Sequence, residues 1–385
     1  MVWLCFYMDI HDKIDLIKRG TEEILTEENL QHLLETGVPL NHYIGFEISG
    51  KVHLGTGLIC MAKIKDFIDA GISCSIFLAD WHSWINDKLG GDIDKIREVA
   101  VGYFKEGLKA GLLCVGADPN KVKFTLGTEL YHNNDGYWET VIDVCKSTTL
   151  SRMQRSITIM GRKQGENVDF AKLLYPAMQV ADIFIQNINF AHAGYDQRKA
   201  HVITRDIALK MKKNNLIDTE GEKIKPVCVH NHLILGLQKP PIWPLKDDEQ
   251  LRELWSQMKM SKSIPNSAVF IHDNPDEIKE KIGSAFCPEG NAAFNPILDW
   301  TKSIIFREKD SYFQVKRPAK FGGDMEFYSY QELEDAYLNK KIHPLDLKNS
   351  VSNKIIEILE PAREHFEKAR VKKMRRHMEE LIVTR

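Results

Sequence analysis

The sequence contains no C-x-x-C pair. It has 7 cysteines, an odd number, and they lie far apart in the chain. This spacing excludes a zinc ribbon and a disulfide scaffold, and it is typical of reduced thiols in a cytosolic protein. The chain also has no uninterrupted apolar run of about 18 residues and no basic start before its first apolar stretch, so neither a membrane span nor a secretory signal is predicted. We therefore expect a cytoplasmic protein with no membrane partner.

The charges nearly cancel, because 52 Lys and Arg face 54 Asp and Glu, for a net charge of -2. Such a balance does not exclude nucleic acid as a partner, but it requires any nucleic acid to be bound by local basic patches. The sequence also lacks internal repeats and low-complexity tracts. Its 385 residues, 43% of them hydrophobic, indicate a globular protein of two or three domains.

The first part of the chain alternates apolar runs with amphipathic ones. Residues 43–47, 73–79 and 227–230 are predicted to be strands, and residues 54–70 have apolar side chains at helical spacing before Gly71. This alternation predicts βαβ units and a Rossmann-like parallel sheet, hence an α/β fold class with a mostly helical C-terminal domain.

The composition changes near Cys287, after which most segments are amphipathic helices, predicted over 331–338, 346–359 and 362–383. The last is basic, which is also expected for a solvated helix face. We expect four parts: an N-terminal helical segment (1–30), a Rossmann-like domain (31–230), a connecting segment (231–285) and a helical domain (286–385).

A glycine-rich turn, Gly50-Lys51-Val52-His53-Leu54-Gly55-Thr56-Gly57, lies between a predicted strand and a predicted helix. The amide groups at a helix N-terminus favour an anion, and His53 can donate to phosphate oxygens. The turn is neither a Walker loop nor G-x-G-x-x-G, and glycines at such a position are also ordinary turn chemistry.

A second phosphate signal, Lys259-Met260-Ser261-Lys262-Ser263, lies about 200 residues further on. Two lysines around a small flexible pair suit a loop that closes over a polyphosphate, although a solvated surface turn has the same composition.

A third signal is a polar stripe on an otherwise apolar helix. Tyr175, Gln179 and Asp182 are spaced i, i+4 and i+7, and Pro176 suits the first turn of this helix. A helix that is apolar nearly all round is buried, so its polar stripe faces either a cavity or neighbouring backbone groups.

The two phosphate motifs together resemble those of the class I aminoacyl-tRNA synthetases, with Thr56 where the first motif often has a second histidine. With Tyr43-Ile44-Gly45-Phe46-Glu47 and Asp196-Gln197-Arg198-Lys199 added, the chain is similar to tyrosyl-tRNA synthetases of the archaeal and eukaryotic type from about Asp9 to the last helix.

The resemblance implies a ligase that activates L-tyrosine with ATP and Mg²⁺, and then transfers it to the 3′ end of tRNA(Tyr). It implies no tightly bound cofactor, no protein metal site and no protein nucleophile. The implied catalytic residues are His53, Lys259 and Lys262, and the implied ATP-binding residues are His53, Gly55, Thr56, Lys259, Met260, Ser261, Lys262 and Ser263.

The resemblance also implies how tyrosine is held. Tyr43 and Asp182 are expected at its hydroxyl, since a donor and an acceptor left unpaired would reject phenylalanine. The remaining residues implied for the tyrosine site are Tyr175, Gln179 and Gln197 at the α-amino group, Glu47 near that group, His82 along the pocket, and Phe77, where relatives carry an aliphatic residue.

For tRNA, the resemblance implies contacts of the acceptor end with Arg155, Arg198 and Lys199, and of the anticodon with Phe321, His343 and Asp346, in a homodimer. Arg155 is equally suited to a surface salt bridge, and Asp346 to capping its helix. Two other functions remain open: a tryptophanyl-tRNA synthetase or related adenylate-forming enzyme, and a synthetase-like RNA-binding protein without catalysis.

Overall fold

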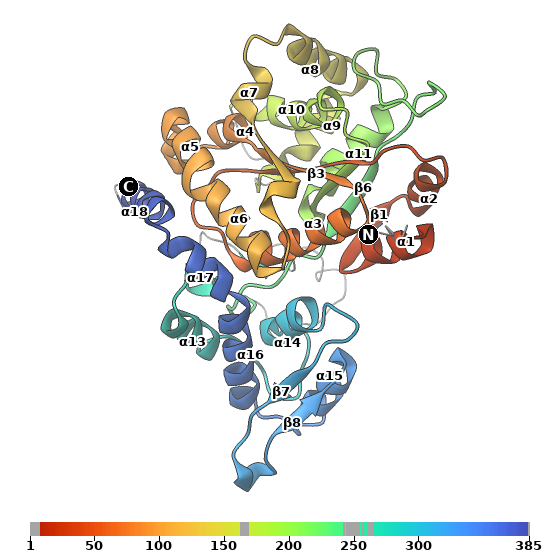
Figure 1. Ribbon diagram of the computed structural model, residues 1–385. Coiled ribbons are helices and arrows are strands. Elements are labelled where there is room, and N and C mark those ends of the chain that lie inside the picture. Colours follow the sequence, from red (N-terminus) through yellow and green to blue (C-terminus); the bar gives the residue numbers. More distant parts are fainter. Residues whose placement is uncertain are drawn as a thin grey trace, which may run out of the picture.

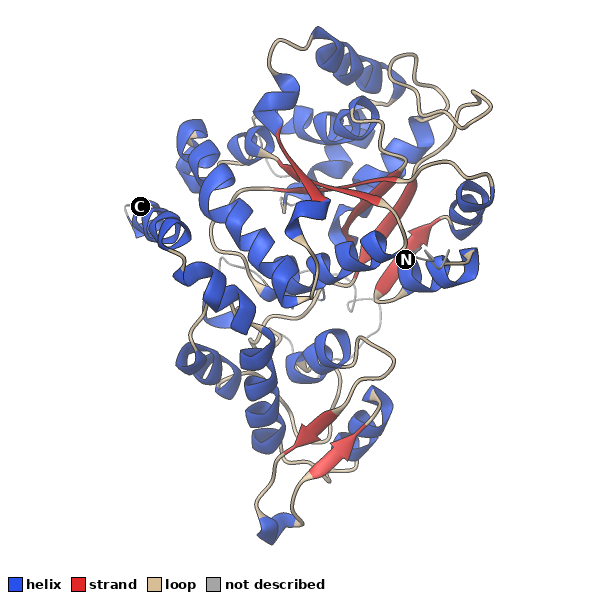
Figure 2. Cartoon of the chain, in the orientation of Figure 1, coloured by secondary structure: helices blue, strands red, loops and turns tan. Residues whose placement is uncertain are grey.

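The computed structural model describes residues 8–161, 169–241, 243, 255, 258–260 and 265–383. An α/β part occupies the upper half of the view in Figure 1, and a smaller, mainly helical part lies below it (Figures 1 and 2). The larger part is built on a six-stranded sheet, and the smaller part contains a two-stranded one.

The large sheet has the strand order β1-β6-β5-β2-β3-β4. Its strands are β1 (Thr21–Leu25), β2 (Asn41–Phe46), β3 (Ser73–Leu78), β4 (Val122–Leu126), β5 (Phe190–Gly194) and β6 (Val227–Asn231). All neighbours run parallel except β1, which is antiparallel to β6. The chain leaves β2 toward β3 and leaves β5 toward β6, so a topological switch point lies between β2 and β5. Ligands of open α/β sheets bind at the carboxyl ends of the strands beside such a point.

Side-chain alternation along the strands divides the α/β part into two cores. Ile44 and Ile76 face one core, together with α3 (Cys60–Asp69) and α6 (Lys105–Cys114). Tyr43 and Phe77 face the other, together with α8 (Asp135–Ser147), α10 (Ala171–Ile185) and α11 (Arg198–Ile207). Both faces of the sheet are therefore covered, as a parallel sheet requires.

The other α-helices of this part are α1 (Ile10–Lys18), α2 (Glu27–Glu35), α4 (Asp80–Ile85), α5 (Ile93–Val99), α7 (Gly127–Tyr131) and α9 (Leu150–Ser156). The N-terminal segment that was predicted to be helical thus also holds β1, which extends the main sheet.

Two local predictions are corrected. The helix predicted over 54–70 opens with a π-type turn, η1 (Gly55–Ile59), before α3 begins. Helix α10 begins at Ala171, so Pro176 lies inside it rather than in its first turn. The earlier start follows from Asp169, whose carboxylate accepts the backbone N–H of Lys172 at 3.2 Å.

The smaller part contains α13 (Pro275–Gly283), α14 (Pro296–Trp300), β7 (Phe313–Val315), β8 (Met325–Phe327), α15 (Tyr330–Leu338) and α16 (Pro344–Ile358). The last two helices, α17 (Glu360–Glu367) and α18 (Ala369–Val383), return to the α/β part and contact α6 and α5 (Figure 1). The single helix predicted over 362–383 is therefore wrong, because Lys368 leaves the helical region with ψ 128° and separates α17 from α18. Among the described residues, no helix has the length and apolar character needed to cross a bilayer.

Candidate active site

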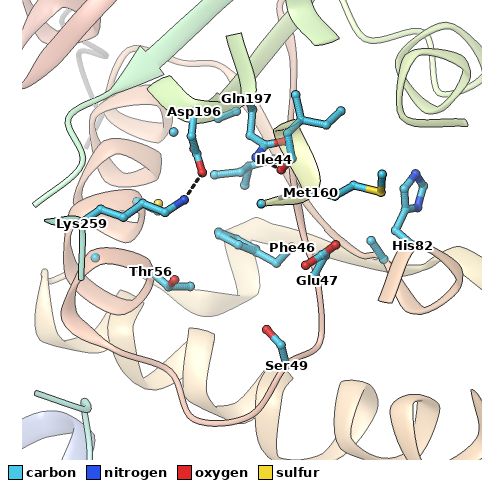
Figure 3. Close-up of a pocket in the computed structure, with 18 of the residues that line it drawn as sticks. Ile44, Phe46, Glu47, Ser49, Thr56, His82, Met160, Asp196, Gln197 and Lys259 are labelled. Carbon is cyan, nitrogen blue, oxygen red and sulfur yellow. Dashed lines mark hydrogen bonds and ion pairs between the residues drawn. The ribbon is translucent and has the colours of Figure 1, made fainter. Parts of the chain in front are cut away.

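A cleft of about 910 Å³ opens at the carboxyl ends of the parallel strands. It is lined by the end of β2, by Ala79 after β3, by Gly194 at the end of β5 and by Asn231 at the end of β6. Residues of η1 and the Lys259–Met260 pair line it as well, and Figure 3 shows Thr56 and Lys259 beside the central space. The cleft therefore lies at the switch point of the sheet.

Asp182 lies in this lining with its side chain fully buried. Its Oδ1 accepts a hydrogen bond from the Tyr131 hydroxyl at 2.9 Å, whereas its Oδ2 has no hydrogen-bond partner among the described residues. Burial raises the pKa of Asp182 well above its usual range, and burial beside this carboxyl likewise raises the pKa of Tyr43. A ligand that donates a hydrogen bond to Oδ2 would offset the cost of burying this oxygen.

His82 and Phe77 form apolar walls beside this carboxyl. The His82 ring packs edge-on against Tyr175, with ring centroids 4.6 Å apart, and its Nε2 lies 3.7 Å from Asp182 Oδ2. Burial lowers the pKa of His82 to about 3, so the imidazole is neutral and does not form an ion pair with Asp182. Phe77 packs against Tyr43, with ring centroids 5.9 Å apart.

A second set of polar groups surrounds Glu47, just beyond β2. Its Oε1 accepts hydrogen bonds from the Tyr175 hydroxyl at 2.9 Å and from Asn86 Nδ2 at 2.8 Å, and its Oε2 lies 3.2 Å from Lys88 Nζ. These contacts hold the Glu47 carboxylate in place at the wall of the cleft, where it can bind a positively charged group of a ligand.

Gln179 and Gln197 meet across the cleft from α10 and from the short turn before α11. Gln179 Nε2 donates to Gln197 Oε1 at 3.3 Å, and Gln197 Nε2 donates to the carbonyl of Ile159 at 2.9 Å. Since Gln179 Oε1 has no partner among the described residues, it is available to a ligand. The predicted polar stripe of α10 therefore faces the cleft.

The glycine-rich turn that was predicted to bind phosphate is hydrogen-bonded to residues 269–271, which follow Lys259 in the chain. Leu54 N–H donates to the carbonyl of Val269 at 3.1 Å, and Ile271 N–H donates to the carbonyl of Val52 at 3.0 Å. His53 and Thr56 line the cleft between these bonds. A Cβ at Gly55 would lie 3.0 Å from the His53 ring, so a glycine at that position lets the ring fold over the helix start.

Lys259 reaches the same space from the opposite side. Its ammonium forms an ion pair with Asp196, as Figure 3 shows, and Met260 N–H donates to the carbonyl of Ile234 at 2.8 Å. The Lys259 side chain is 35% exposed and therefore free to exchange Asp196 for a phosphate. Ser261, Lys262 and Ser263 lie outside the described residues.

The family model described as tRNA synthetases class I (W and Y) matches residues 35–360. The chain belongs to this family. The predicted family, the predicted α/β fold class and the aminoacyl-tRNA synthetase activity are thereby confirmed.

Individual relatives support the same assignment. The synthetase is 60% identical to the tyrosine–tRNA ligase of Thermococcus kodakarensis, over 94% of this chain and 96% of that protein. It is 56% identical to the crystal structure of the Pyrococcus horikoshii tyrosyl-tRNA synthetase complexed with L-tyrosine, with a TM-score of 0.93 over 96% of this chain and 100% of the other. The tryptophanyl-tRNA synthetase of Aeropyrum pernix, at 16% identity and a TM-score of 0.63, shares the fold alone.

The residues predicted to contact the tRNA acceptor end lie together at the start of α11 and on α9. Lys199 Nζ donates to Thr158 Oγ1 at 2.9 Å and to the carbonyl of Arg155 at 3.4 Å, while Arg155 Nη1 donates to Ser151 Oγ at 2.6 Å. Arg198 Nε donates to both carboxylate oxygens of Glu23.

The residues predicted to contact the anticodon lie in the smaller part of the synthetase. Phe321 follows β7 and is 61% exposed, and His343 and Asp346 lie at the start of α16. The suggestion that Asp346 caps this helix is wrong, since His343 Nδ1 accepts the N–H of Leu345 at 3.2 Å as the N-cap. Asp346 lies in the first turn instead.

Sequence reasoning missed several residues of the site. Tyr131, Asn86 and Lys88 belong to no motif, and only their place after strands at one sheet edge would have suggested them. His232 lines the cleft between Asp299 Oδ1, 2.7 Å from its Nε2, and Glu22 Oε2, 3.3 Å from its Nδ1. These carboxylates outweigh burial and raise the pKa of His232 to about 9.

Proposed function

We propose that the cleft binds L-tyrosine and ATP side by side, joins them as tyrosyl-adenylate with release of pyrophosphate, and then passes the tyrosyl group to the terminal ribose of tRNA(Tyr). The predicted tyrosine–tRNA ligase activity is confirmed by relatives of that name, such as the Thermococcus sibiricus protein at 59% identity over 94% of this chain. The observation that carries the substrate assignment is the buried Asp182 with Oδ2 unpartnered among the described residues.

In this proposal the substrate phenol donates a hydrogen bond to Asp182 Oδ2 and accepts one from the Tyr43 hydroxyl. Phenylalanine lacks the hydroxyl and would leave the buried oxygen unpaired, which is the physical basis of rejection in sites of this kind, of which tyrosine synthetases are the known example. Tyr175, Gln179 and Gln197 hold the α-amino group, with Glu47 supplying the countercharge and His82 the adjoining wall. The distances around Glu47 and Gln179 support these roles.

ATP lies over the glycine-rich turn, with Mg²⁺ bound to its phosphates. The tyrosine carboxylate attacks the α-phosphate, so no protein nucleophile is needed. His53 and Lys259 hold the phosphates together with the amides near Gly55 and Thr56. Lys262 adds a second cation, and Met260, Ser261 and Ser263 complete the residues proposed to bind ATP. Catalysis then comes from positioning and from stabilising the charge that develops on the phosphates.

Arg155, Arg198 and Lys199 bind the tRNA acceptor end. Lys199 contacts the Arg155 carbonyl, and Arg198 precedes Lys199 at the start of α11, which supports this role. Phe321 stacks on the first anticodon base, and Asp346 accepts a hydrogen bond from that base with His343 beside it. In this division, residues 31–230 are the catalytic domain, 231–285 connect it through the Lys259 loop, and 286–385 read the anticodon, while 1–30 precede the catalytic domain.

We also propose a cytoplasmic homodimer. The supporting feature is an exposed apolar surface on α4 and α8, where Trp84 and Trp138 flank Trp81 with ring centroids 5.9 and 5.8 Å away. Ile142, one helical turn after Trp138, is 59% exposed. Exposed apolar patches of this kind mark protein interfaces. Analytical ultracentrifugation of Ile142→Glu tests the proposal, with a monomer as the expected result.

ATP–pyrophosphate exchange with tyrosine, tryptophan and phenylalanine tests the substrate. We expect exchange with tyrosine only, and we expect Asp182→Asn to lower kcat/KM for tyrosine by about 10- to 100-fold, the value of one hydrogen bond to a charged group. Asp118→Asn, a surface carboxylate that caps a distant turn, is the control. Tyrosine exchange undiminished in Asp182→Asn would contradict the proposed pocket, and tRNA binding without any exchange would favour a non-catalytic RNA-binding protein.

A further inference from the structure

Below Arg198 lies a chain of polar groups that the proposed reaction does not use. Strand β1 is antiparallel to β6 and places Glu23 opposite His230 in the register. The Glu23 carboxylate accepts hydrogen bonds from Arg198 Nε at 2.8 and 3.0 Å, and its Oε2 lies 3.0 Å from His230 Nδ1. Glu23 therefore connects an exposed arginine to a histidine with no exposed surface.

A second buried histidine continues this chain. His201 Nδ1 lies 3.0 Å from His230 Nε2, and both rings are buried between α11 and the sheet. Burial lowers the pKa of His230 to about 4 and that of His201 well below its usual range, so both rings are neutral. A neutral imidazole has one donor and one acceptor.

His230 Nδ1 lies 3.0 Å from Glu23 Oε2 but makes no hydrogen bond among the described residues. The buried ring therefore lies against the inner side of the carboxylate without donating to it. The carboxylate in turn contacts Arg198 through Nε, so this contact does not use the outer Nη groups of the guanidinium.

We propose that Glu23, which lies against the buried His230 and accepts from Arg198 Nε, is a positioning residue that orients Arg198 toward the end of the tRNA acceptor stem. A guanidinium fixed at Nε presents its two Nη groups in one plane, which suits the paired acceptors of a base edge or a phosphate. The inference rests on the tRNA contact proposed for Arg198. It gives β1 a role in reading tRNA and none in activating tyrosine.

The test compares tyrosine activation with tRNA charging in Glu23→Gln, Arg198→Ala and the double variant. Exchange with tyrosine is expected to stay at the wild-type rate in Glu23→Gln. The kcat/KM for tRNA charging is expected to fall about tenfold in Glu23→Gln, because one charge-assisted hydrogen bond is lost. The ratio of kcat/KM for tRNA with the native first base pair to that for tRNA with a swapped pair is expected to fall by the same factor. The double variant is expected to match Arg198→Ala.

Two further variants separate positioning from folding. Glu27→Gln removes a surface ion pair with Lys18 close to β1 in the chain, and it is expected to charge tRNA normally. Arg198→Lys keeps the positive charge without the Nε–H, and it is expected to be as weak as Arg198→Ala and insensitive to Glu23→Gln. Because the Arg198 side chain is partly exposed, the Arg198→Lys variant is expected to fold like the wild type.

The outcomes distinguish the inference from the tRNA contact on which it rests. If Arg198→Ala charges normally, the proposed tRNA contact fails and the role of Glu23 fails with it. If Arg198→Ala is weak but Glu23→Gln charges normally, only the positioning role is overturned. Additive losses in the double variant, or an equal loss of exchange and charging in Glu23→Gln, would show that Glu23 acts on structure alone.

Discussion

Removing the Tyr131 hydroxyl is the sharpest test of the tyrosine pocket. Tyr131→Phe deletes the hydroxyl that donates to Asp182 Oδ1 at 2.9 Å, in a site where both side chains are buried. The ring itself remains, with its packing against Tyr137 at 4.1 Å and Phe77 at 6.1 Å between centroids. The substitution therefore changes one hydrogen bond and little else.

The expected change in kcat/KM follows from the ionised state of Asp182, which binding of the tyrosine hydroxyl favours. A phenol bound at Oδ2 favours ionised Asp182, and a hydrogen bond to an ionised group contributes about 1.5–3 kcal/mol. Without Tyr131 the pKa of Asp182 rises further, so kcat/KM for tyrosine is expected to fall by about 10- to 100-fold. Phenylalanine does not use Oδ2, so its much slower activation is expected to change little.

The assay is ATP–pyrophosphate exchange with each amino acid, together with unfolding in denaturant. Tyr330→Phe is the matched control, because it also removes a tyrosine-to-carboxylate bond, to Glu334 at 2.7 Å, but in the smaller part of the chain. The reasoning is refuted if Tyr131→Phe leaves tyrosine activation intact, or if it slows tyrosine and phenylalanine by the same factor.

Three further predictions concern other regions. Phe321→Ala is expected to weaken tRNA charging without changing tyrosine activation, and an equal loss in both assays would make Phe321 structural. Gly111→Ala is expected to destabilise the fold by about 1–3 kcal/mol in denaturant titrations, since its Cβ would collide with the carbonyl of Gly57, whereas an unchanged midpoint would contradict this packing. The pKa of His232 is raised to about 9, so its ion pairs stabilise the fold fully below about pH 6.5 and lose their effect as the pH rises through 9. The free energy of unfolding of His232→Gln is therefore expected to be lower than that of the wild type by about 3 kcal/mol at pH 6, and the difference is expected to vanish above pH 9. A difference in unfolding free energy that is constant with pH would exclude this explanation.

The sequence was most informative where spacing determines geometry. The polar stripe of α10 could be placed on one helix face because Tyr175, Gln179 and Asp182 follow the helical period, and in the structure all three line the cleft. The strands around the cleft were recognisable for a similar reason, since buried parallel strands are short apolar runs.

What the sequence did not reveal depends on contacts between distant segments. Tyr131, on α7, forms its hydrogen bond with Asp182 on the distant helix α10. Glu23 contacts Arg198 because β1 pairs with β6. The start of α10 was misplaced because a single carboxylate, that of Asp169, accepts the N–H of Lys172 at 3.2 Å. Neither pairing between remote strands nor one capping bond leaves a periodic pattern in the sequence.

The pairing of β1 with β6 has a consequence during synthesis on the ribosome. Thr21 lies opposite Asn231, so β1 is synthesised about 200 residues before β6, the strand that it pairs with. At the usual 5–20 residues per second, about 10 to 40 s pass before β6 is made. The edge of the sheet that carries Glu23 can therefore form only after β6 has been synthesised.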